Sequence, residues 1–228
     1  MSPELPPALP DDNKHALRQV VRSCVKATLC TLLAEDGAPY GSLVTLALDH
    51  DLSPILLLSG LSDHTRNLAA DPRVSLLFDG TEGHPNPQTG PRVTVMGRAE
   101  RSDDPRLRAR FLARHPAAAL YAGFADFGIW RVEALRVHFV GGFGRAVWFS
   151  TPFGLNLDLA AALADGEAEV RGQSIPTKEG RAEVIGWDAD GIDVIQNDVY
   201  NRIAFGKPVE TLEEARESLK NLQLQGPF

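Results

Sequence analysis

The chain has 228 residues, of which 43% are hydrophobic and 23% charged, the composition of an ordinary globular protein with one or two domains. Its formal net charge of −7 argues against general nucleic-acid binding, which requires a basic surface. Residues 1–10 lack the features of a signal peptide, and no apolar run is long enough to span a membrane. We therefore expect a cytoplasmic protein that binds neither nucleic acid nor a membrane.

The first part of the chain is predicted to form a helix followed by three strands. Residues 1–11 are rich in proline and are expected to be a flexible arm. A helix is predicted at 12–24, because apolar residues recur there at helical spacing. Three strands are predicted next, at residues 27–33, 40–48 and 55–59. The two cysteines, Cys24 and Cys30, lie among apolar neighbours and are expected to be buried free thiols.

The middle of the chain is predicted to continue with short helices between strands. Ser62 is typical of a helix N-cap, and Asp71-Pro72 ends that helix. Residues 73–79 are apolar on both faces, which predicts a strand in the centre of a sheet. Residues 80–91 hold three prolines and three glycines and are predicted to be a loop. A strand at 92–100 and a helix from Pro105 to His115 are predicted after it.

The last part of the chain changes character near Thr151-Pro152. Before that point, strands are predicted at 127–132, 136–140 and 146–149. After it we predict a helix at 157–163, short strands around 188–191 and a final helix whose capping box is Thr211 and Glu214. Short strands in hairpins indicate a mainly β fold with α additions. We expect a barrel domain at 12–150 and a small α+β domain at 151–228.

One segment has the residue types of an anion-binding site. Ser62, His64, Thr65 and Arg66 fall in the first turns of a predicted helix. A helix N-terminus presents free N–H groups and a positive dipole end, and arginine can bond phosphate oxygens in a bidentate manner. The alternative interpretation is an ordinary capped surface helix with Arg66 in solvent.

Several motifs resemble a known family. Residues 68–78 and 92–100 are similar to the helix-to-strand stretch and a later barrel strand of the pyridoxamine 5′-phosphate oxidase superfamily. Residues 39–44, 64–68 and 140–146 resemble its haem-utilisation branch, and the tail after residue 151 resembles the small α+β domain that often follows this barrel. The resemblance implies a split β-barrel of the FMN-binding type and a homodimer with sites at its interface.

The same resemblance assigns cofactor-binding roles. It implies that residues 59–67 hold the FMN phosphate, that strand 40–45 lines the flavin ring, and that the region of Trp130 contacts flavin from a second subunit. The expected cofactor-binding residues are Ser42, Val44, Ser59, Ser62, His64, Thr65, Arg66, Asn67, Arg92 and Trp130. Asp63 departs from the family, because the oxidases usually have a basic residue there. The substrate-phosphate motif Arg-x-His of the oxidases is missing, so vitamin B6 oxidation is not expected.

The sequence therefore favours an FMN-binding protein, a flavin-dependent oxidoreductase of unknown substrate. Two alternatives stay open: a haem-binding or haem iron utilisation protein, and a non-catalytic flavin-binding module. The histidines are scattered without the spacing of a metal site, and none follows His138, so the tail has no histidine to ligate haem. No catalytic residue and no metal ligand are predicted.

Overall fold

The computed structural model describes residues 9–224, so most of the expected N-terminal arm, residues 1–8, lies outside the described residues. The first sheet has seven strands in the order β3-β2-β1-β4-β5-β6-β7, and an added β3–β6 pairing closes six of them into a barrel. Its strands are β1 (Lys26–Leu32), β2 (Pro39–Leu48), β3 (Pro54–Ser59), β4 (Arg73–Asp79), β5 (Arg92–Ser102), β6 (Phe127–Val140) and β7 (Ala146–Ser150). All pairings are antiparallel.

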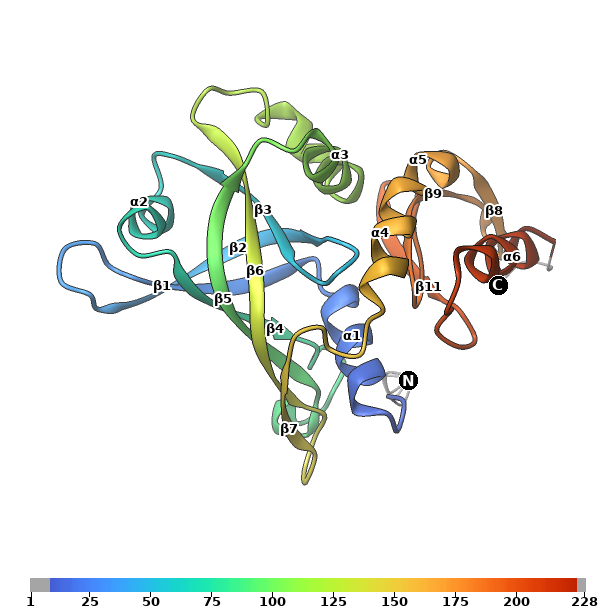
Figure 1. Ribbon diagram of the computed structural model, residues 1–228, viewed down its shortest axis with the longest axis horizontal. Coiled ribbons are helices and arrows are strands. Elements are labelled where there is room, and N and C mark those ends of the chain that lie inside the picture. Colours follow the sequence, from blue (N-terminus) through green and yellow to red (C-terminus); the bar gives the residue numbers. More distant parts are fainter. Residues whose placement is uncertain (1–8, 225–228) are drawn as a thin grey trace.

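Helices cover the ends and one side of this split barrel (Figure 1). They are α1 (Asn13–Ser23), α2 (Asp63–Ala70), α3 (Pro105–Arg114) and the short 3₁₀ turns η1 (Pro87–Thr89) and η2 (Pro116–Leu120). Side chains of Asp12 and Asp104 cap α1 and α3 by accepting backbone N–H bonds. The barrel core is filled by inward-facing residues of every strand, among them Leu29, Leu76 and Phe139, all below 1% exposed.

The structure differs from the sequence prediction at β6 and agrees with it at β4. β6 is one continuous strand of 14 residues rather than two strands. A register shift between Met96 and Gly97 lets β6 bend at that point without ending, and a Cβ on Gly97 would lie 2.0 Å from the Glu133 carbonyl oxygen. β4 does lie inside the sheet, but one of its faces is exposed, so Leu77 is 39% exposed. The predicted position of this strand in the centre of the sheet is confirmed.

Cys30 also departs from its prediction. Cys24 is buried, and burial raises the pKa of its thiol to about 11. Cys30 is only partly buried, because it lies on the face of β1 that points away from the barrel core. Both thiols are free.

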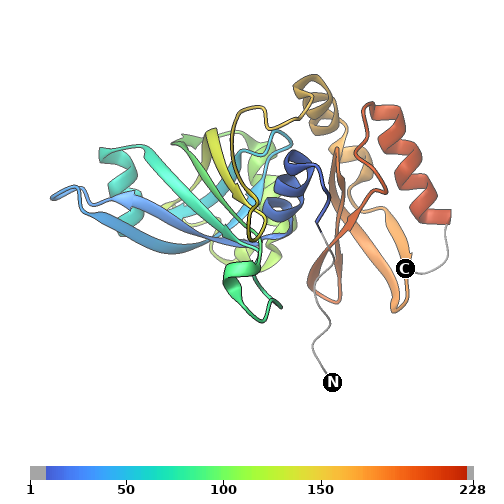
Figure 2. The ribbon, with the colours of Figure 1, turned by 90° about the horizontal axis from the view of Figure 1, so that it is seen from below.

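The C-terminal part forms a second, smaller α+β unit. Its four strands lie in the order β11-β10-β9-β8, and three helices pack beside them (Figure 2). These elements are α4 (Leu157–Asp165), α5 (Glu167–Val170), β8 (Ser174–Thr177), β9 (Gly180–Asp188), β10 (Gly191–Gln196), β11 (Val199–Ala204) and α6 (Leu212–Leu224). Trp187 is fully buried at its centre and donates a hydrogen bond to the Leu163 carbonyl. The Thr211 hydroxyl accepts from the Glu214 N–H at the start of α6.

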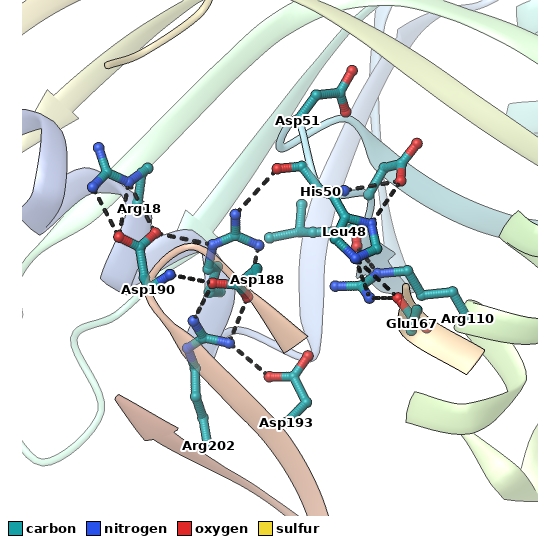
Figure 3. A network of polar contacts seen from close by, with 12 residues as sticks. Arg18, Leu48, His50, Asp51, Arg110, Glu167, Asp188, Asp190, Asp193 and Arg202 are labelled. Atoms are coloured by element: carbon teal, nitrogen blue, oxygen red, sulfur yellow. Dashed lines mark hydrogen bonds and ion pairs between the residues drawn. The ribbon is translucent and has the colours of Figure 1, made fainter. Parts of the chain in front are cut away.

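Buried ion pairs join the two units. Arginines of α1 and α3 enter a cluster of carboxylates that the second unit supplies (Figure 3). Arg18 contacts Asp190 at 2.8 Å, and Arg22, only 1% exposed, contacts Asp188 at 3.0 Å. Arg202 of the second unit lies within 2.8 Å of both Asp188 and Asp193. A buried pair gives little net stability, but a buried charge left alone is strongly unfavourable, so the two units depend on each other.

A second part of this cluster surrounds His50. The Arg110 guanidinium pairs with Glu167 and donates to the Leu48 carbonyl. His50 lies between two carboxylates, with its Nε2 atom 3.0 Å from Glu167 and its Nδ1 atom 3.4 Å from Asp49. Burial alone would raise the pKa of Glu167, but Arg110 and His50 outweigh burial and hold it at about 2.

Candidate functional site

The predicted phosphate site at the start of α2 is a compact cluster of hydroxyls and one imidazole. The Ser62 hydroxyl donates to the Ser59 carbonyl at 2.7 Å and contacts His64 Nε2 at 2.8 Å and Thr65 Oγ1 at 3.0 Å. Ser62 is the N-cap by position, but its side chain makes no capping bond to the helix. These hydroxyls therefore form hydrogen bonds with one another and with the backbone at the end of β3.

Burial shifts His64 toward its neutral form. Its side chain is partly buried, and burial lowers the pKa of the imidazole more than the nearby Asp63 raises it. A neutral imidazole adds no positive charge for a phosphate. The cluster consequently relies on Arg66 for its positive charge.

Arg66 is engaged by its own helix. Its guanidinium donates to the Leu61 carbonyl at 2.8 Å and pairs with the Asp63 carboxylate, and its side chain is 60% exposed. An exposed pair of this kind contributes little to stability, so an anion in solvent competes with Asp63 for Arg66. Asp63 remains a negative charge beside any phosphate bound there.

Ser59 and Asn67 hold the cluster in place. The Ser59 hydroxyl donates to Asp126 at 2.5 Å, which ties the end of β3 to the segment before β6. Asn67 is buried, accepts from the Ala34 N–H and donates to the Thr31 hydroxyl at 3.0 Å. Both amide groups of Asn67 are therefore used to fix α2 on β1.

The other predicted site residues lie elsewhere on the barrel. Val44 is 6% exposed and belongs to the core, and the Ser42 hydroxyl faces the Leu29 carbonyl at 3.5 Å. Trp130 packs partly buried against the core. The Arg92 guanidinium donates hydrogen bonds to the carbonyls of Gln88 and Gly90. In the sheet, Arg92 lies opposite Val140 at one end of β6, whereas Ser59 lies opposite Phe127 at the other end. Within one chain, the structure does not bring Arg92 to the α2 cluster.

The sequence did not reveal the outer face of the sheet. This face is the side of strands β2, β1, β4, β5, β6 and β7 that points away from the barrel core. Directly opposed residues of an antiparallel pair share one face. The register therefore places one row across six strands: Leu43, Thr28, Leu77, Thr94, His138 and Trp148. Leu43 is 73% exposed and Trp148 53% exposed, so the row alternates apolar side chains in solvent with two threonines and a histidine.

The β6–β7 end of this row carries a stack of rings. The rings of His138 and Trp148 are stacked, with centroids 4.5 Å apart and planes tilted by 17°. The Arg136 guanidinium lies 4.8 Å from the centroid of the Trp148 ring. No signal in the sequence identified these residues, because alternation shows which residues share a face of one strand but not which residues they oppose on the next.

A cavity of about 270 Å³ lies where the barrel meets α4. Asp49, His50, Asp51 and Arg106 line it together with apolar residues of α4. Its charges are already paired, since Arg106 holds Asp49 at 2.7 Å and Arg131 holds Asp51. The cavity belongs to the junction between the two units and offers no free charge for a ligand.

Residues 9–224 show neither a metal-binding cluster nor a helix that could span a membrane. Among them, no group of three or more His, Cys, Asp or Glu side chains is arranged to hold a metal ion. None of the helices described there has the length and apolar character needed to cross a bilayer.

Comparisons with known proteins agree with this architecture. The family model described as pyridoxamine 5′-phosphate oxidase matches residues 14–141. The chloroplastic "Non-canonical heme oxygenase HOZ" of Arabidopsis thaliana is 36% identical over 141 residues, which cover 58% of this chain and 43% of that protein. The chain thus spans less than half the length of that curated relative.

Two solved structures are similar over nearly the whole chain. A protein of unknown function from Agrobacterium tumefaciens is 27% identical with a TM-score of 0.74, covering 96% of this chain and 99% of its own. A heme binding protein from Mycobacterium smegmatis is 28% identical with a TM-score of 0.59, covering 95% of this chain and 98% of its own. The similarity extends beyond the barrel into the C-terminal unit.

Proposed function

The chain belongs to the pyridoxamine 5′-phosphate oxidase family, and from this premise we propose that it is a haem-binding protein that holds haem against the outer face of its barrel. The observation that carries the proposal is the outer row, with its exposed leucines and the stacked rings of His138 and Trp148 at one end. Haem is a planar, largely apolar macrocycle with two carboxylates and an iron that accepts imidazole. The outer face offers all three matching groups: apolar surface, arginines and a histidine.

Relatives support the same ligand. The Arabidopsis protein is by name a heme oxygenase and the mycobacterial protein a heme binding protein. Among the predicted site residues, the α2 cluster gives weaker support for a flavin, because Asp63 pairs with Arg66 and burial lowers the pKa of His64. We therefore place haem ahead of FMN, which reverses the order that the sequence alone favours.

The proposed assembly is a homodimer that buries part of the outer face. Leu43 and Leu77 lie at the β2–β1–β4 part of the row, where exposed leucines are costly to leave in water. A second copy packed on this part leaves the β6–β7 end at the margin of the interface. The haem then lies at the interface, within reach of the partner chain.

FMN is the second candidate. It is favoured by the family match and by the three hydroxyls of Ser59, Ser62 and Thr65 that gather beside Arg66. A flavin held there would supply redox chemistry through its ring, and the protein would then be an oxidoreductase. A non-catalytic flavin-binding module would use the same residues.

The remaining parts of the proposal concern partners and compartment. The net charge of −7 supports a small-molecule ligand rather than nucleic acid. Two free thiols fit a reducing compartment, which supports a location in the cytoplasm.

A titration of the purified full chain with ferric haem, and separately with FMN, tests the proposal. We expect haem to give a Soret band that saturates at one haem per chain, and FMN to bind more weakly by fluorescence quenching. Saturable FMN binding without a saturable Soret band would instead establish the second candidate. Neither signal would refute both.

A further inference from the structure

The proposed function leaves open which residue contacts the iron. We propose that His138 ligates the haem iron, with Trp148 as the aromatic wall beside it and Arg136 as the partner for the propionate edge. This inference rests on the proposed haem binding, and it names the residues of that same site.

Most histidines of the chain are already engaged. Four of the six have a polar partner at a ring nitrogen: His15 with Gln19, His50 with Glu167, His64 with Ser62 and His115 with the Leu46 carbonyl. Within residues 9–224, no residue makes a hydrogen bond to a ring nitrogen of His138 or of His84. His84 lies in the loop between β4 and β5 and belongs to no strand, whereas His138 lies in the outer row, between Thr94 and Trp148.

Stacking leaves the nitrogens of His138 available. An imidazole binds a metal through the lone pair in its ring plane, at the edge of the ring. The Trp148 ring covers a face of the His138 ring, 4.5 Å away between centroids, and therefore does not block that edge. The stack instead restricts how the imidazole can rotate, which favours a defined ligand geometry.

The row continues from His138 to a threonine and then to an exposed leucine. Thr94 lies directly opposite His138 on β5, and Leu77 lies directly opposite Thr94 on β4. Neighbouring strands are about 4.8 Å apart, so these positions extend roughly 10 Å from His138 across the sheet. Thr94 and the exposed Trp148 therefore lie beside His138 under the macrocycle, and Leu77 lies at its outer edge, where the proposed second copy begins.

Arginines flank His138 on both sides along the strands. Arg136 is two residues before His138 on β6, and Arg92 is opposite Val140, two residues after it. Two residues of a strand span about 7 Å, so the cations lie roughly 14 Å apart along the strand. Arg136 is exposed and contacts the Trp148 ring, and none of residues 9–224 accepts a hydrogen bond from its guanidinium. The two propionates of haem leave the macrocycle from one edge, so Arg136 matches that edge, whereas Arg92 lies on the other side of His138 and bonds the carbonyls of Gln88 and Gly90.

The test compares haem spectra of the full-length protein with those of His138→Gly and of the control His84→Gly. We expect His138→Gly to lose the imidazole-ligated spectrum and to bind haem more than about tenfold more weakly, with millimolar imidazole restoring the spectrum. His84→Gly should match the unmodified protein, since it removes a histidine without touching the row. Thermal melts of the haem-free proteins check that His138→Gly is folded, and because His138 is on the outer face we expect its melting temperature to change little.

The outcomes separate the ligand from the function. An unmodified protein without a saturable Soret band would overturn the proposed function and this inference together. A normal Soret band that is unchanged in His138→Gly would overturn only the assignment of His138. If His138→Gly keeps the ligated spectrum and either His84→Gly or His64→Ala loses it, that other histidine is the iron ligand. Such a result would likewise overturn the assignment of His138.

Discussion

At the residue scale, Asp63 and Arg66 determine how strongly the start of α2 can bind an anion. The carboxylate pairs with the guanidinium on the surface, and both side chains are more than half exposed. The sequence identified the hydroxyls, the histidine and the arginine of this segment correctly as neighbours, since they follow one another within one helical turn. It did not reveal that Asn67 faces inward to Thr31, because that contact joins residues 36 positions apart.

Replacing Asp63 by asparagine tests this interpretation. Asp63→Asn removes a negative charge beside the site and frees Arg66, so we expect FMN affinity to rise about fivefold, a gain of about 1 kcal/mol for an exposed charge. Quenching of flavin fluorescence measures the affinity. Arg66→Ala serves as the matched control and should lower it. Equal affinities in all three proteins would show that flavin does not use this segment.

At the scale of elements, helix ends and strand positions follow from local residue types, whereas strand pairing does not. The caps Asp12 and Asp104 mark α1 and α3 because their carboxylates bond the first free N–H groups. The bend of β6 depends on its register shift opposite Gly97, a residue of β5. The outer row depends on the registers of five strand pairs. Such long-range pairings have no signal within a short window of sequence.

The helix α3 provides a prediction about the junction between the two units. Arg110→Met leaves the Glu167 carboxylate buried without its main partner, and such a loss typically costs about 3–5 kcal/mol. Arg216→Met is the control, because Arg216 pairs with Glu169 on the surface, where a pair is worth about 0–1 kcal/mol. Urea denaturation measures the free energy of unfolding for both variants. Similar small losses would contradict the importance of the buried pair.

At the scale of the whole molecule, the junction makes stability sensitive to acid. Glu167 has a pKa near 2 in the folded protein against an ordinary value of 4.5. Burial alone would raise the pKa of Asp188 and Asp193 as well, but Arg202 and neighbouring arginines outweigh it and lower both values. A group whose pKa is lowered by folding stabilises the protein above its unfolded pKa and loses that contribution as pH falls toward the folded value.

We therefore expect the free energy of unfolding to decrease as pH falls from about 4.5 to about 2, with roughly 3 kcal/mol of the decrease due to Glu167. Urea unfolding at a series of pH values measures this. Glu167→Gln should be less stable at neutral pH and should show a shallower decrease. Stability that stays constant over this pH range would contradict the account of the junction.

The proposed dimer can be tested on the outer face. Leu77→Arg places a charge at an exposed leucine in the middle of the row, so we expect the variant to elute as a monomer where the unmodified protein elutes as a dimer. Leu120→Arg, at an exposed leucine of η2 outside the row, is the control and should remain dimeric. Light scattering coupled to gel filtration gives the masses. A monomeric unmodified protein, or a dimeric Leu77→Arg variant, would contradict this interface.

The most direct measurement locates the iron itself, by anomalous X-ray diffraction at the iron absorption edge from crystals of the haem-loaded protein. The account predicts one iron peak per chain over the outer face, at bonding distance from a ring nitrogen of His138 and beside the Trp148 ring. An iron peak at the start of α2, in the junction cavity or nowhere on the protein would contradict it.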